Sequence, residues 1–229
     1  MNKLLTTLIV LAVASVTGPG YAQAPPAAPA AAAPAGAKSI DAKVAMCIGC
    51  HGIVGYQASF PEVYKVPKIS GQSAKYIISA LTAYKKGDRK HPTMRGIADS
   101  LSEQDMNDIA NYYQASGKVQ GETLPEKADK QPSPQVATLL QKAACVSCHG
   151  ANFAKPIDPT YPKIAGQHAD YLFVALKAYK TENNAQIGRS NGVMGAIAKQ
   201  FSNNELKALA GYVSSLEGNL KTVPERKFR

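Results

Sequence analysis

C-I-G-C-H at residues 47–51 and C-V-S-C-H at residues 145–149 decide how this chain is interpreted. Both follow the C-x-x-C-H attachment signature of a c-type haem. Two sulfurs three positions apart can form thioethers to both vinyl groups of one porphyrin, and the histidine that follows can bind the iron. The sequence therefore predicts two covalently bound haem c groups. The attachment residues are all four cysteines of the chain: Cys47, Cys50, Cys145 and Cys148.

Zinc or a redox dithiol is the alternative interpretation of two C-x-x-C pairs. A zinc ribbon separates its two pairs by roughly 15–20 residues. Here the second pair begins at Cys145, much farther from Cys50. The long separation favours haem over zinc.

The first residues indicate export. Lys3 precedes an apolar run at residues 4–16, and small residues follow near Ala22 and Ala24. The run is shorter than the roughly 20 apolar residues that span a bilayer. We therefore expect a signal peptide over residues 1–22, with cleavage after Ala22 or Ala24. Export agrees with haem attachment outside the bacterial cytoplasm, so the predicted location is the periplasm.

An internal repeat of roughly a hundred residues organises the rest of the chain. Residues 67–72 read P-K-I-S-G-Q, and residues 162–167 read P-K-I-A-G-Q. Further residues recur in the same order: Tyr76, Leu81, Tyr84, Arg89 and Met94 as Tyr171, Leu176, Tyr179, Arg189 and Met194. The second half departs from the first by a short insertion at residues 181–187.

The repeat predicts two domains, at residues 38–117 and 133–218. A polar linker over residues 118–132 separates them, and a Pro/Ala-rich tether over residues 23–37 precedes them. The basic residues at 219–229 are expected to form a solvated tail. Each half is small enough that a large apolar cofactor would supply much of its core.

Helical signals fit both halves. Ser39 and Ser133 are N-cap candidates for helices that run to the haem cysteines, and Pro134 suits a first helical turn. Ser102 with Asp105, and Ser202 with Glu205, resemble capping boxes ahead of apolar stripes. No strand-like alternation of useful length appears. The predicted fold class is all-α.

A methionine in each half is the predicted sixth iron ligand, opposite His51 or His149. Met94 and Met194 match under the repeat and are expected in loops before the last helix of each half. Met46 adjoins Cys47 on the histidine side of the ring and cannot easily reach the other face. Met106 is replaced by Leu206 in the other half, which indicates a core position.

His91 and His168 are rival sixth ligands. His91 matches Asn191 and His168 matches Ser73, so neither histidine is repeated. A surface position or a contact to a haem propionate is the preferred interpretation for both.

Four further residues are candidates for contacts around the haems. The carbonyls of Pro67 and Pro162 are expected to accept a hydrogen bond from the second nitrogen of the axial histidine; alternatively, these prolines only shape a turn. Arg89 and Arg189 can pair with haem propionates, or they can be exposed.

The charge balance bears on partners. The chain carries 26 basic and 16 acidic residues, a formal net charge of +10. This charge favours acidic redox proteins or an anionic membrane surface as partners. Nucleic acid is excluded because the basic residues are scattered and the chain is exported. A small-molecule substrate is excluded because histidine and methionine would fill both axial positions of each iron.

These features together resemble the dihaem cytochrome c4 family over residues 38–218. The resemblance implies two class I cytochrome c domains packed about a pseudo-twofold axis. It implies a periplasmic, often membrane-associated carrier that passes electrons from a quinol-oxidising complex toward a terminal oxidase. It also assigns His51 and Met94 to one haem iron, and His149 and Met194 to the other.

Two other functions compete with a free electron carrier. The chain can be the cytochrome subunit of a periplasmic dehydrogenase complex, which would use the same two haems. It can also be a dihaem enzyme, such as a peroxidase or a thiosulfate dehydrogenase. The enzyme would need an open or unusual sixth position, which the matched methionines argue against.

Overall fold

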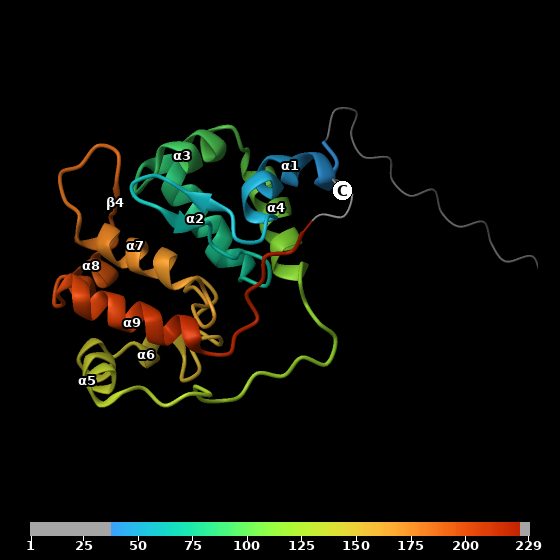
Figure 1. Ribbon diagram of the computed structural model, residues 1–229. Coiled ribbons are helices and arrows are strands. Elements are labelled where there is room, and N and C mark those ends of the chain that lie inside the picture. The colour runs from blue at the N-terminus through green and yellow to red at the C-terminus, as the bar shows by residue number, and fades with distance from the viewer. Residues whose placement is uncertain (1–37, 225–229) are drawn as a thin grey trace, which may run out of the picture. The chain divides into compact units, whose positions relative to one another are not determined.

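Nine helices account for about half of the residues in the computed structural model, which describes residues 38–224. The predicted signal peptide and tether, and the last part of the basic tail, lie outside the described residues. Four helices belong to the first half and five to the second (Figure 1). Their bounds are α1 Ile40–His51, α2 Ala74–Lys86, α3 Pro92–Asp99, α4 Glu103–Ala115, α5 Pro134–Ala143, α6 Val146–His149, α7 Ala169–Lys180, α8 Gly192–Ala198 and α9 Asn203–Ser215.

The strands found between residues 38 and 224 are only two residues long, so the all-α prediction is confirmed. They are β1 Gln57–Ala58, β2 Tyr64–Lys65, β3 Arg89–Lys90 and β4 Gly188–Arg189. β1 pairs with β2 inside the first half. β3 and β4 pair antiparallel across the two halves, with Arg89 opposite Arg189.

The helices begin where the sequence places polar caps. The side chain of Ser39 accepts from Ala42 N–H at the start of α1, and Ser133 accepts from Val136 N–H at the start of α5. α1 continues through the first C-x-x-C-H motif. In the second half this prediction is wrong, because α5 ends at Ala143 and the next residue, Ala144, is left-handed with φ 47°.

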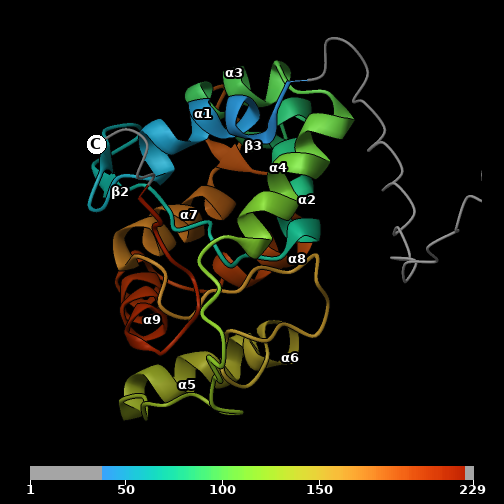
Figure 2. The same ribbon diagram turned by 90° about the vertical axis from the view of Figure 1, so that its right-hand side faces the viewer.

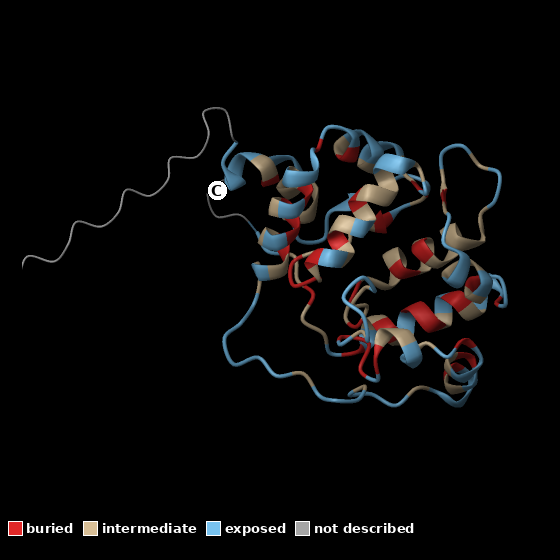
Figure 3. Ribbon diagram, turned by 180° about the vertical axis from the view of Figure 1, so that it is seen from behind, coloured by how far each residue is buried: buried red, intermediate tan, exposed pale blue. Residues whose placement is uncertain are grey.

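The two predicted capping boxes are both present, at the starts of α4 and α9. Behind each box, apolar side chains on one helix face are buried; in α4 they include Met106 and in α9 the equivalent Leu206. α2 packs against α4 in the first half, and α7 packs against α9 in the second (Figures 1 and 2). Burial is concentrated on these inward faces (Figure 3).

The linker and the C-terminal segment both make specific contacts. Linker carbonyls accept hydrogen bonds from the second half, including Pro125 O from the Asn152 side chain at 2.6 Å. After α9 the chain returns to the first half, where Lys221 N donates to Ser70 O at 3.0 Å. Lys221 Nζ also lies 2.9 Å from a Glu122 carboxylate oxygen. Lys221 is therefore not part of a solvated tail.

Candidate functional site

Both motif histidines are held by the main chain in the same way. His51, the last residue of α1, has its Nδ1 2.9 Å from the carbonyl oxygen of Pro67. His149, the last residue of α6, has its Nδ1 3.0 Å from the carbonyl oxygen of Pro162. A carbonyl can only accept, so each Nδ1 carries the proton and each Nε2 keeps a free lone pair. The contacts expected from the sequence are present, and they leave Nε2 as the nitrogen able to bind a metal.

Burial supports the same protonation state. It lowers the pKa of both His51 and His149 below the ordinary value of 6.5, while the carbonyl contact opposes this shift. A neutral imidazole is the form that ligates iron. Both imidazoles are therefore kept neutral by their surroundings.

The candidate methionines lie in helices rather than in the expected loops. Met94 is the third residue of α3, and Met194 is the third residue of α8. The loop prediction is wrong because each short helix is started by a local cap that apolar periodicity does not reveal. Met94 is partly buried against the core cluster of the first half, and Cys47 packs against the same cluster.

The caps of these two helices are His91 and Asn191. His91 Nδ1 accepts from Met94 N–H at 3.3 Å, and Asn191 Oδ1 accepts from Met194 N–H at 2.9 Å. His91 Nε2 also lies 3.0 Å from the hydroxyl of Tyr64. Sequence reasoning missed this role, although the match of His91 with Asn191, three residues before a repeated methionine, carried the signal.

The remaining candidate ligands have structural surroundings of their own. His168 is the N-cap residue of α7 without a side-chain capping bond, and it matches Ser73 at the start of α2. Met106 is 4% exposed and belongs to the first core cluster, as predicted. Met46 is exposed on α1.

The four cysteines are free and half-buried, as attachment to haem requires. Cys47 packs against the core cluster of the first half. Cys145 packs against both clusters of the second half. Their thiols are therefore placed at the edges of the two cores and remain available for thioether bonds.

The surroundings of two arginines at the junction of the halves indicate whether a haem fits. Arg89 is buried and donates to the Tyr76 hydroxyl at 3.1 Å; Arg189 donates to the Tyr171 hydroxyl at 3.2 Å. Each guanidinium also lies over a second tyrosine ring. Within residues 38–224 neither arginine has a carboxylate in an ion pair.

A buried guanidinium without an anion is costly, and porphyrin propionates would supply that anion. The exposed alternative for Arg89 is wrong, and the lack of a carboxylate partner among the described residues for the buried Arg89 and the half-buried Arg189 is compatible with a haem propionate beside each of them. The residues present thus suit the group that the C-x-x-C-H motifs predict.

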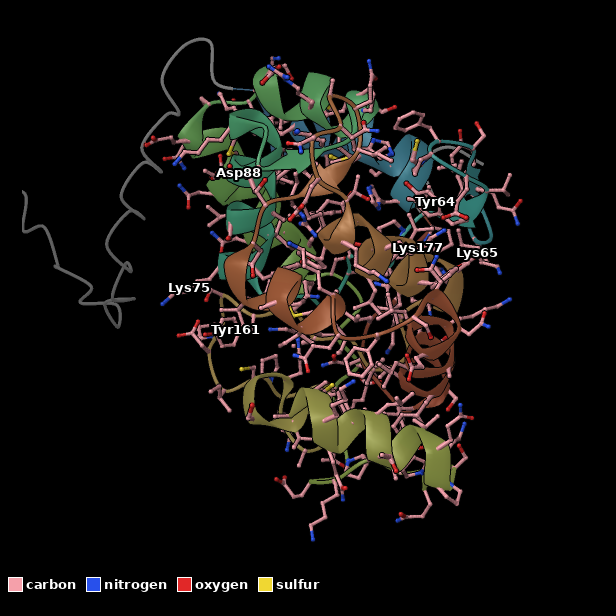
Figure 4. All side chains as sticks on the ribbon, turned by 90° about the vertical axis from the view of Figure 1, so that its left-hand side faces the viewer. Tyr64, Lys65, Lys75, Asp88, Tyr161 and Lys177 are labelled. Carbon is pink, nitrogen blue, oxygen red and sulfur yellow. The ribbon has the colours of Figure 1, made fainter. Side chains whose placement is uncertain are left out.

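The halves also meet beside these arginines. The Lys65 N–H donates to a carboxylate oxygen of Asp170 at 3.0 Å, and Lys177 of α7 forms an ion pair with Glu62. Figure 4 shows Tyr64 and Lys65 of β2 next to Lys177. From the insertion at residues 181–187, Asn184 O accepts from Lys90 Nζ at 2.6 Å. Polar contacts from several elements therefore fix the junction.

Known proteins share both the sequence pattern and the fold. The family described as "Cytochrome c" matches twice, at residues 33–116 and 135–217. Cytochrome c4 of Stutzerimonas stutzeri is 30% identical over 227 residues, covering 94% of this chain and 100% of that protein. The "thiosulfate dehydrogenase electron acceptor" of Thiomonas intermedia is 27% identical, covering 80% of this chain and 84% of that protein.

A solved structure agrees. Reduced recombinant cytochrome c4 from Pseudomonas stutzeri superimposes with a TM-score of 0.54 at 27% identity, covering 78% of this chain and 97% of that one. Both halves of the present chain thus correspond to cytochrome c domains. The chain belongs to the dihaem cytochrome c4 family, an electron-transfer cytochrome with two covalently bound haem c groups.

Proposed function

We propose that this protein is a periplasmic electron carrier in which His51 and Met94 bind one haem iron, and His149 and Met194 bind the other. When bound, each haem c supplies an iron that alternates between the ferric and ferrous states. The single observation that carries the assignment is the repeated contact from histidine Nδ1 to a proline carbonyl, at 2.9 and 3.0 Å, which frees Nε2.

The side chains of two histidines and two methionines would hold the two haem irons. Each methionine is held by a capped helix start, through His91 in α3 and Asn191 in α8. A soft thioether favours the ferrous state, and a filled coordination shell leaves no position for a substrate. This arrangement suits outer-sphere transfer of single electrons with little change in the protein structure. We therefore propose an electron carrier and not an enzyme.

The proposed route is from a quinol-oxidising complex toward a terminal oxidase. The excess of basic residues supports docking to acidic redox proteins or to an anionic membrane surface; the whole chain has a formal net charge of +10, which loss of Lys3 with the signal peptide and the haem propionates would reduce. No helix within residues 38–224 is both long and apolar enough to cross a bilayer. The predicted signal peptide supports the periplasmic location.

A second candidate role is electron acceptor or subunit of a periplasmic dehydrogenase. The observation that favours it is the similarity to a protein named thiosulfate dehydrogenase electron acceptor. Purifying the native protein separates the two roles. Stoichiometric co-purification with a dehydrogenase would overturn the free-carrier role, and a lone cytochrome reduced by a quinol-oxidising complex would support it.

Substitution of Met94 tests the ligand assignment. The near-infrared charge-transfer band of ferric iron with a thioether is recorded for the purified dihaem protein, together with its reduction potentials. Met94→Ala should remove the part of the band due to one haem and lower the potential of that haem. Met106→Leu is the matched control, because it introduces the residue found at the equivalent core position and should leave both bands intact. An unchanged spectrum in Met94→Ala would reject the assignment.

A further inference from the structure

Two buried glutamines cross between the halves in a reciprocal way. Gln167 Oε1 accepts from Lys68 N–H at 3.0 Å, and its Nε2 donates to Lys68 O at 2.9 Å. Gln72 makes the same pair of bonds to Lys163, both at 3.0 Å. Each glutamine is only 4% exposed. We call Gln72 and Gln167 the crossed glutamines.

Each crossed glutamine binds the peptide group that also holds an axial histidine. The carbonyl of the Pro67–Lys68 peptide faces His51 Nδ1 at 2.9 Å, while its N–H donates to Gln167. One planar amide therefore lies between a histidine of the first half and a glutamine of the second. The Pro162–Lys163 peptide repeats this arrangement between His149 and Gln72.

We propose that each crossed glutamine sets the reduction potential of the haem in the opposite half. Gln167 acts on the haem ligated by His51, and Gln72 acts on the haem ligated by His149. The proposal rests on the axial ligands of the proposed function. The crossed glutamines are positioning residues that act through a peptide and a histidine.

Amide resonance gives the direction of the effect. An acceptor at the peptide N–H draws electron density toward the carbonyl oxygen, so hydrogen bonds in such a chain strengthen one another. The stronger acceptor pulls the Nδ1 proton and makes the imidazole a better donor to iron. A better donor stabilises the ferric state, so each crossed glutamine lowers the potential of the opposite haem.

The two lysines of these peptides are partly buried and form further bonds across the junction. Lys68 Nζ donates to Gly166 O at 2.7 Å, and Lys163 Nζ donates to Gly71 O at 2.8 Å, each across the junction. Burial lowers the pKa of both lysines. In this low-dielectric environment the polarisation of the peptide is weakly screened.

The experiment compares Gln167→Met with Gln72→Met in the purified dihaem protein. Methionine keeps the length of the side chain and removes both hydrogen bonds across the junction, together with the bond that each Oε1 accepts from the N–H of the following residue. Losing one cooperative bond should change the reduction equilibrium constant of the opposite haem by about threefold, which is roughly 30 mV for a one-electron couple. The potential rises for the haem of His51 in Gln167→Met and for the haem of His149 in Gln72→Met.

Proton NMR identifies which haem responds. The Nδ1 proton of each axial histidine is assigned through contacts to residues of its own half, and it should shift in the half opposite to the substitution. Ser73→Ala is the matched control. It removes another bond across the junction, from Ser73 Oγ to Pro159 O at 2.6 Å, without touching either peptide. Both potentials should stay at their wild-type values in this control.

The outcomes separate the two proposals. A wild-type protein without two thioether bands would overturn the axial ligands themselves. With both bands present, a shift in the haem of the same half, an equal shift in both haems, or no shift in either would overturn the crossed effect alone. If Gln167→Met fails to assemble with haem, Gln167→Asn replaces it, because asparagine keeps the amide but withdraws it by one methylene.

Discussion

Replacing His91 with alanine should remove the N-cap of α3 and so weaken the binding of Met94 to the haem iron. The His91 side chain starts α3 by accepting from Met94 N–H at 3.3 Å. Alanine cannot accept this bond, so the first turn of α3 loses its cap at the residue proposed to bind iron. His91→Asn should restore the cap, because Asn191 makes the equivalent bond to Met194 at 2.9 Å.

The size of the effect follows from the cost of losing a cap. Removing an N-cap side chain costs about 1 kcal/mol, which corresponds to about a fivefold change in an equilibrium constant. Imidazole added to the ferric protein competes with the thioether for the iron. In His91→Ala the apparent affinity of imidazole for the haem of the first half should therefore rise about fivefold, because the competing Met94 is held less firmly.

The assay follows loss of the thioether band as imidazole is added. Asn191→Ala should produce the corresponding change at the other haem. Tyr64→Phe is a control that removes the Tyr64 hydroxyl next to His91 Nε2 and keeps the cap itself. Equal behaviour of His91→Asn and His91→Ala, or an equal change at both haems in His91→Ala, would refute the role of this cap.

Three further predictions concern stability, measured as the denaturant midpoint of the dihaem protein. Gly150→Ala should destabilise by about 1–3 kcal/mol, since φ is +80° and the new Cβ would lie 2.1 Å from Lys155 O; an unchanged midpoint refutes this. Gly211→Ala should stabilise by up to about 1 kcal/mol, because Gly211 lies on the exposed face of α9 with nothing within 4 Å of the new Cβ; a lower midpoint would contradict this. Hydrogen bonds from Ser102 and Lys43 depress the pKa of Asp105 below its ordinary value of 3.8. Their contribution to folding stability is therefore fully present above pH 3.8 and is lost as the pH falls through the depressed pKa. The loss of stability in Lys43→Met should therefore become smaller in acid. A loss of stability that does not depend on pH would count against this ion pair.

The sequence predicted the features that short-range chemistry controls. The repeat, the caps at Ser39 and Ser133, and the boxes before α4 and α9 follow from local residue patterns. The contact between His51 and Pro67 was also predicted, because the motif and the P-K-I segment recur together. These features need only neighbouring residues or a repeated spacing.

Long-range pairing could not be predicted in this way. Nothing in the pattern around Gln72 reveals a partner at Lys163, since the contact forms only when the two halves pack. The same holds for the burial of Arg89 opposite Arg189. The break at Ala144 was missed because alanine is ordinarily a strong helix former, and tertiary context overrides that propensity.

The returning segment after α9 changes what a cut in the chain would do. Leu220 is buried, and Lys221 pairs with Ser70 of the first half in an isolated antiparallel bridge. The two halves are thus connected twice. The linker joins them covalently, and the segment after α9 joins them through hydrogen bonds to the first half. A protease that cleaved between α4 and α5 would remove the covalent connection but leave this bridge and the other hydrogen bonds across the junction in place.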